Sequence, residues 1–186
     1  MDMNMDRVSF WAGKPELKWP LTAGPNLWDR REAIRIVASM LDKPRVLEIG
    51  VDSADVLLHA HDTFGAYTGV DVSLAKSSVR DFSGVVCPYQ FVEKPSVDFW
   101  KSLGKNDVYD FVYVDGHHGE RETHLDVTQA MLRLAPGGYI MCHDIDNHGE
   151  DTGPVWAYNR TCNLPGWYSR VLECHAEGMA IYFHTP

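Results

Sequence analysis

Short apolar runs alternate along this chain with segments of helical period. The runs "RVLEIG", "AYTGVDV", "PYQFVE", "YDFVYVDG" and "YIMCHD" each have the length and composition of a buried strand. Helices are expected between them, one beginning near Ser53, one capped by Ser96, and one over "ERETHLDVTQAMLRL". Strands separated by helices predict right-handed βαβ units and a parallel α/β sheet that is covered on both faces.

The two ends of the chain differ from this middle part. Residues 1–25 hold three prolines and two tryptophans without a regular period, which predicts an irregular arm that can act as a lid over a site. Residues 26–41 have the pattern of a helix that ends at Pro44. After Pro154 we expect a short helix, and then "WYSRVLE" and "MAIYFH" as a hairpin at the sheet edge. The sequence thus predicts one domain over residues 1–186.

Composition and charge narrow the class of protein. A chain of 186 residues with 45% hydrophobic content can bury one substantial core. The net charge of -9 and the pI near 5.4 disfavour nucleic acid and anionic membrane as partners. The sequence lacks a signal-peptide pattern, a C-x-x-C pair and an apolar stretch of about 20 residues. We therefore expect a soluble, cytoplasmic protein with reduced thiols. The sequence is compatible with a monomer or a homo-oligomer.

Polar residues follow the predicted strands at the ends where ligands bind in open α/β sheets. The alternative for any one acid is that it caps the next helix; Asp115, for example, could cap the helix that starts near Glu120. It is less plausible that every polar residue at these strand ends is there by coincidence. In chain order the set consists of Glu48, Gly50, Asp71, Asp115, His118, His143 and Asp144.

The loop after the first strand indicates the kind of nucleotide. A dinucleotide site needs G-x-G-x-x-G, so that bare backbone can approach a pyrophosphate. Here "EIGVDSAD" has Asp52 and Ala54 at the later glycine positions, and Asp55 adds a charge that would repel phosphate. Asp71, 21 residues beyond Gly50, is placed to accept hydrogen bonds from ribose hydroxyls. S-adenosylmethionine fits these residues, because it has a ribose, a sulfonium and an ammonium but no phosphate.

The motifs "VLEIG", "GVDVS", "YDFVYVDG" and "LRLAPGGYIMCHD" resemble those of class I S-adenosylmethionine-dependent methyltransferases over residues 46–144. This resemblance implies a Rossmann-like doubly wound sheet of seven strands, in the order 3-2-1-4-5-7-6 with the last strand antiparallel. It also implies a cofactor site. The residues that would bind S-adenosylmethionine are Glu48, Gly50, Ser53, Asp71, Val72 and Asp115.

"VDGHHGE" followed by "HD" is similar to the metal-dependent macrolide and sugar O-methyltransferases. That similarity implies a divalent cation on Asp115 and Asp144 and a catalytic base at His118. His143 offers a further nitrogen ligand, or is a bystander at the rim. Two carboxylates with water suit Mg²⁺, and a histidine ligand would favour Mn²⁺. Two departures concern the cofactor: the glycine loop has lost two glycines, and "EKPS" stands where an acid often helps to hold adenine.

Three functions are compatible with these residues. The first is a metal-assisted O-methyltransferase that acts on a hydroxyl of a small molecule, such as a sugar or a catechol. The second is a catalytically degenerate S-adenosylmethionine-binding module with a regulatory or partner role, which the altered loop at Asp52 favours. The third is a nicotinamide-dependent oxidoreductase, which the acids of the same loop disfavour. Asp115, His118 and Asp144 together favour the first, since a module without chemistry needs no such set.

Overall fold

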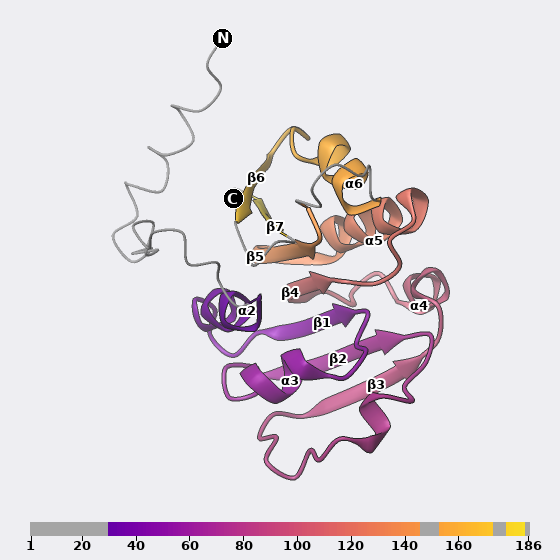
Figure 1. Ribbon diagram of the computed structural model, residues 1–186. Coiled ribbons are helices and arrows are strands. Elements are labelled where there is room, and N and C mark those ends of the chain that lie inside the picture. Colours follow the sequence, from indigo (N-terminus) through magenta and orange to yellow (C-terminus); the bar gives the residue numbers. More distant parts are fainter. Residues whose placement is uncertain (1–29, 146–152, 173–177, 185–186) are drawn as a thin grey trace.

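A single seven-stranded sheet organises the described part of the chain. The computed structural model describes residues 30–145, 153–172 and 178–184. The sheet order is β3-β2-β1-β4-β5-β7-β6 (Figure 1), and β7 runs antiparallel to both of its neighbours. Both features confirm the predicted topology, and the predicted arm of residues 1–25 lies outside the described residues. The strands are β1 (Arg45–Ile49), β2 (Ala66–Asp71), β3 (Tyr89–Glu93), β4 (Tyr109–Val114), β5 (Leu134–His143), β6 (Trp167–Leu172) and β7 (Met179–His184).

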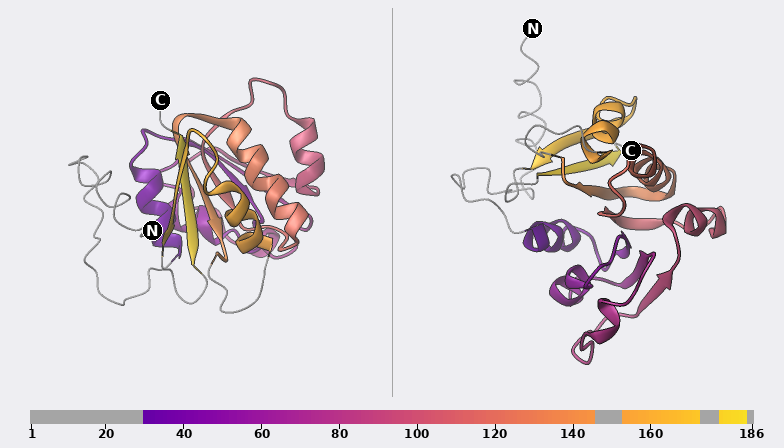
Figure 2. Two further views of the ribbon diagram at one scale, coloured as in Figure 1. Left: turned by 90° about the horizontal axis from the view of Figure 1, so that it is seen from above. Right: turned by 45° about the vertical axis from the view of Figure 1, so that its right-hand side comes forward.

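Helices cover both faces of this sheet, as expected (Figure 2). Side chains alternate along β1, so that Val46 packs in the cluster with α2 and α3 while Leu47 packs in the cluster with α4 and α5. Within the described residues, no helix has the length and apolar character needed to cross a membrane. The helical elements are α2 (Arg30–Ser39), α3 (Asp55–Ala60), the short 3₁₀ turn η1 (Ser77–Val79), α4 (Ser96–Ser102), α5 (Glu120–Arg133) and α6 (Gly153–Thr161).

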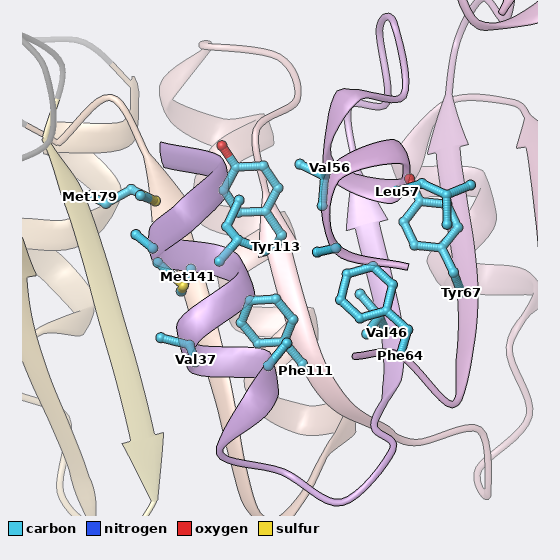
Figure 3. Packing of buried hydrophobic residues seen from close by; sticks show 14 of the residues in the cluster. Val37, Val46, Val56, Leu57, Phe64, Tyr67, Phe111, Tyr113, Met141 and Met179 are labelled. Atoms are coloured by element: carbon cyan, nitrogen blue, oxygen red, sulfur yellow. The ribbon is translucent and has the colours of Figure 1, made fainter. Parts of the chain in front are cut away.

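The core on the α2 side anchors the central strand β4 (Figure 3). Phe111 and Tyr113 of β4 are fully buried beside Val37 of α2 and Met141 of β5. Burying a side chain of this size contributes about 1.5 to 3 kcal/mol of stability. Several such contacts fix the position of β4. The backbone at Val114, and hence the start of the polar segment that follows it, is therefore well defined.

Two local predictions were wrong. We expected β5 to begin at Tyr139, but it begins at Leu134, which pairs with Tyr109 before a register shift leads to the pairing of Phe111 with Tyr139. The segment "APGG" has turn residues and yet continues the strand through this irregularity. We also expected Ser96 to cap α4; the cap position is Pro95, and Ser96 is the first helical residue.

Candidate active site

The ends of β1 and β4 meet at Gly50. The Gly50 amide donates a hydrogen bond to the Val70 carbonyl at 2.8 Å, and the Asp115 amide donates to the Ile49 carbonyl at 2.8 Å. Gly50 has a φ of 90°, and a Cβ atom there would collide with the Asp115 backbone. Only glycine fits both the conformation and the space. This contact brings the residues after β1, β2 and β4 to one rim.

The loop after β1 keeps left-handed backbone conformations without its later glycines. Asp52 and Ala54 have φ values of 46° and 59°. A residue with a side chain pays roughly 1 to 2 kcal/mol for this conformation. The strain indicates that the surrounding structure imposes the loop shape, and strained backbone of this kind concentrates at functional sites.

Basic side chains partly neutralise the acids of this loop, which the sequence alone did not indicate. Lys76 Nζ lies 2.6 Å from Asp52 Oδ1, and Arg80 Nη2 lies 3.0 Å from Asp55 Oδ1. Both basic residues come from the segment after β2, which the sequence did not place beside the loop. Repulsion of phosphate by these acids is therefore weaker than expected, and the choice of cofactor must rest on other features.

Asp71 is held in place at the end of β2. Its Oδ2 accepts a hydrogen bond from the Asp52 amide, and its Oδ1 accepts one from the Ser73 amide, each at 3.0 Å. A carboxylate oxygen has a second lone pair, so both oxygens can still accept ribose hydroxyls. Beside it, Val72 is 69% exposed and offers an apolar surface to a planar base. Ser53 is partly exposed in the neighbouring loop.

Glu48 lies deeper than the other expected cofactor residues. Its side chain is on the α2 side of β1, only 2% of the residue is exposed, and the Tyr67 hydroxyl donates to its Oε2. Burial raises the pKa of this carboxyl well above its usual range, although the bond from Tyr67 opposes the shift. A role in cofactor binding stays a prediction for Glu48.

Asp115, His118 and Asp144 come together at the ends of β4 and β5. One ligand atom from each lies within 4.8 Å of the others. His118 Nε2 is 3.0 Å from Asp144 Oδ2 and 4.0 Å from Asp115 Oδ1. Two carboxylates with water suit Mg²⁺ or Mn²⁺, so the residues present fit a divalent cation on Asp115 and Asp144, with the His118 imidazole beside it. We call these three residues the rim triad.

The turn between Asp115 and α5 is fixed by its own hydrogen bonds. The Thr123 hydroxyl donates to the His117 carbonyl at 2.9 Å, and the Gly153 amide donates to the His118 carbonyl at 3.1 Å. The cap position of α5 is Gly119, without a side-chain cap bond. The interpretation of Asp115 as a helix cap is therefore wrong.

His143 lies beneath the two acids. It is 4% exposed, and its Nδ1 is 3.3 Å from Asp115 Oδ1 and 3.2 Å from Asp144 Oδ1. Burial lowers the pKa of His143, but the bonds to both carboxylates outweigh it and raise the pKa to about 9. Burial would raise the pKa of Asp144, but His143 and the other nearby cations lower it overall. His143 thus orients the acids, and its role as a ligand stays a prediction.

Two further residues contact Asp115, and sequence reasoning missed both. The Tyr113 hydroxyl donates to Asp115 Oδ2 at 3.0 Å, and Arg30 Nη1 lies 3.5 Å from the same oxygen. Tyr113 could have been found, because it precedes Asp115 by two residues and shares its face of the strand. Arg30 gives no comparable signal, since its position depends on how α2 packs on the sheet.

Replacing Gly50 tests the meeting of β1 and β4. We expect Gly50→Ala to lower the free energy of unfolding by at least about 2 kcal/mol, from a left-handed backbone and a steric clash together. Gly84→Ala is the matched control, because a Cβ there meets no atom within 4 Å. Urea unfolding measures both variants. Equal stabilities for the two would contradict the proposed constraint.

The raised pKa of His143 predicts a loss of stability at alkaline pH. The pKa of a histidine in an unfolded chain is about 6.5, and that of His143 in the folded state is about 9. The stabilisation is therefore complete below pH 6.5 and is lost as the pH rises through 9. In EDTA, we expect the free energy of unfolding to fall by on the order of 3 kcal/mol across this window.

A comparison with His143→Gln isolates this histidine from the buried Cys142 thiol, whose pKa is also raised by burial. Urea unfolding at pH 6.5, 8 and 9.5 gives the difference in stability between the two proteins. That difference should shrink with rising pH, and a constant difference would show that His143 is not protonated in the folded state.

Solved structures share this fold at low sequence identity. The O-methyltransferase TomG of Streptomyces achromogenes, involved in tomaymycin synthesis and solved with S-adenosylmethionine, has a TM-score of 0.69 and 14% identity, covering 87% of this chain and 83% of that one. The methyltransferase PaMTH1 of Podospora anserina, bound to S-adenosylhomocysteine, has a TM-score of 0.66 and 19% identity, covering 84% and 78%. An O-methyltransferase of Bacillus cereus in complex with the same product has a TM-score of 0.63 and 12% identity, covering 83% and 80%.

No curated protein matches this sequence. A family described as "Methyltransferase domain" nevertheless matches residues 47–145, from the middle of β1 to just beyond Asp144. The match spans more than half of the chain and includes the loop after β1, Asp71 and the rim triad. Together with the sheet order, it confirms the resemblance to class I methyltransferases, and the chain belongs to the methyltransferase domain family.

Proposed function

We propose that this protein transfers the methyl group of S-adenosylmethionine to a hydroxyl of a small molecule, with a divalent cation on Asp115 and Asp144 and with His118 as the base. The observation that carries the proposal is the convergence of Asp115, His118 and Asp144, with their ligand atoms within 4.8 Å, at the edge of the sheet where ligands bind. The related structures named above support the cofactor, because their own bound ligands are S-adenosylmethionine or its product.

The sheet favours a methyl donor over a nicotinamide dinucleotide. A dinucleotide-binding sheet has the order 3-2-1-4-5-6, whereas here an antiparallel β7 lies between β5 and β6. The loop at Gly50 would receive the amino acid end of the cofactor, Asp71 its ribose, and Val72 one face of its base. Asp52 and Ala54 carry side chains at two positions where a dinucleotide loop has glycines, which let bare backbone approach the pyrophosphate.

His118 would accept the proton of the acceptor hydroxyl. A cation on Asp115 and Asp144 would lower the pKa of the acceptor hydroxyl and would hold its oxygen in position. The His118 side chain is half exposed next to Asp144, while His143 is buried against both acids. A positioned base usually contributes 10²- to 10⁴-fold in rate. Sugar and catechol hydroxyls are the acceptor classes that this arrangement suits.

A degenerate cofactor-binding module is the second candidate, and one observation favours it: Asp52 and Ala54 occupy strained positions in the loop after β1. The buried arrangement around the acids argues against loss of chemistry. His143 is nearly inaccessible and bonded to both carboxylates, and Asp144 has a φ of 58°. Such a strained and charged cluster is costly to maintain without a role.

Calorimetry with S-adenosylhomocysteine, NAD and Mn²⁺ tests the proposal. We expect the wild-type protein to bind S-adenosylhomocysteine and Mn²⁺ but not NAD. Asp115→Ala and Asp144→Ala should abolish Mn²⁺ binding while the fold survives, because neither side chain belongs to the apolar clusters of the core. His118→Ala should keep Mn²⁺ binding, as expected for a base. Asp98→Ala removes an exposed acid of α4 and is the matched control.

Each outcome separates the candidates. Binding of S-adenosylhomocysteine without any binding of Mn²⁺ would favour the degenerate module. Tight binding of NAD with no response to S-adenosylhomocysteine would contradict both methyl-donor functions. Loss of Mn²⁺ from His118→Ala would make this histidine a metal ligand and would leave the base to be found elsewhere.

A further inference from the structure

A buried carboxyl group lies beneath the rim and has no part in the chemistry described above. Asp126, on the inner face of α5, is 1% exposed. Its Oδ1 accepts a hydrogen bond from Trp100 Nε1 of α4 at 2.7 Å, and its Oδ2 is a buried atom without a partner among the described residues. Burial raises the pKa of Asp126 above its usual range, while the bond from Trp100 opposes the shift, as does the Ser96 hydroxyl, which is near but outside hydrogen-bond geometry.

The surroundings of Asp126 join three segments of the rim. Ser96 and Trp100 belong to α4, which begins directly after β3. Gly116 belongs to the turn between Asp115 and His118, and a Cβ atom on Gly116 would lie 3.7 Å from Asp126 Oδ2. Asp126 therefore sits where the start of α4, the turn after β4 and the body of α5 approach one another.

Stability alone does not account for an acid at this position. The neighbouring inner positions of α5, Val127 and Ala130, are apolar and fully buried. The Trp100 bond accounts for Oδ1, because an apolar residue here would leave the buried indole N–H unpaired. It does not account for Oδ2, since a buried polar atom without a partner costs about 1 to 3 kcal/mol. Buried polar groups in native proteins are nearly always paired, and an exception points to a particular role.

We propose that Asp126 is a positioning residue for the base end of the cofactor, an inference that rests on the proposed function. The methyl-bearing end of the cofactor must face the rim triad, and Asp71 would hold the ribose. The base then lies on the far side of the ribose, bordered by Val72, the start of α4 and the turn at Gly116. Asp126 lies between the last two of these segments, bonded to α4 through Trp100 and with Oδ2 next to Gly116, and so sets the width of the base pocket.

Two probes and two variants test this inference by calorimetry on the full chain. The probes are S-adenosylhomocysteine and 5′-deoxy-5′-methylthioadenosine, which has the base and ribose but lacks the amino acid end. Asp126→Asn keeps an oxygen for the Trp100 bond and replaces the other oxygen with a donor. We expect this variant to lower the affinity for both probes by the same factor, about tenfold. Ser96→Ala should also lower the affinity for both probes.

Thr161→Val is the matched control for a purely structural effect. Thr161 is also fully buried, and its hydroxyl bonds to the Ala157 carbonyl and the Tyr182 hydroxyl, on α6 and β7 away from the base pocket. It should lower the melting temperature and leave both affinities within about twofold. All titrations are run well below the melting temperature of each variant.

The outcomes are separable from those of the proposed function. If wild-type protein binds neither probe, the proposed function itself fails. If Asp126→Asn lowers the melting temperature but binds both probes like the wild type, Asp126 is structural and the inference is overturned. Weakening of S-adenosylhomocysteine alone would also overturn it, because the defect would then lie at the amino acid end.

Discussion

The contact between Gly50 and the backbone of Asp115 is the constraint on which the rest of the site depends. Parallel strands bring their carboxyl ends to one edge of a sheet, but they do not by themselves set the side chains to within an ångström. Here the Asp115 amide bonds to Ile49 while Gly50 bonds to Val70, so the ends of β1, β2 and β4 are tied by backbone hydrogen bonds. Asp71 and Asp115 are fixed as a consequence of this tie.

The second organising feature is the balance of charge around Asp115 and Asp144. Two carboxylates this close repel each other unless cations or hydrogen-bond donors compensate them. His143 contacts both acids, Arg30 of α2 contacts Asp115, and His118 contacts Asp144. The arrangement compensates both carboxylates and keeps them close together, which is what a bound cation requires.

The sequence was sufficient for most of the fold, because its signals are local. Apolar runs indicated the strands, and helical periods indicated the helices. The methyltransferase motifs implied the sheet order that the structure confirms. The misplaced start of β5 shows the limit of this reasoning: Pro136 and two glycines are turn residues locally, yet pairing with β4 keeps the segment in the strand.

The site was predictable only where its residues follow strands. Asp115, His118 and Asp144 come directly after β4 and β5, and they meet as expected. Arg30, Lys76 and Asp126 act across the fold, through helix packing and loop approach, and nothing in their local sequence marks them. The same limit applies to the charge of the loop after β1: the acids were visible in the sequence, and their basic partners were not.

One crystallographic measurement tests the central claim most directly. Crystals grown with S-adenosylhomocysteine and soaked in Mn²⁺ should show an anomalous peak within about 2.5 Å of carboxylate oxygens from both Asp115 and Asp144. The ribose of the bound product should lie against Asp71. A well-ordered product at saturating Mn²⁺ with no anomalous peak between the two acids would contradict a metal-assisted site.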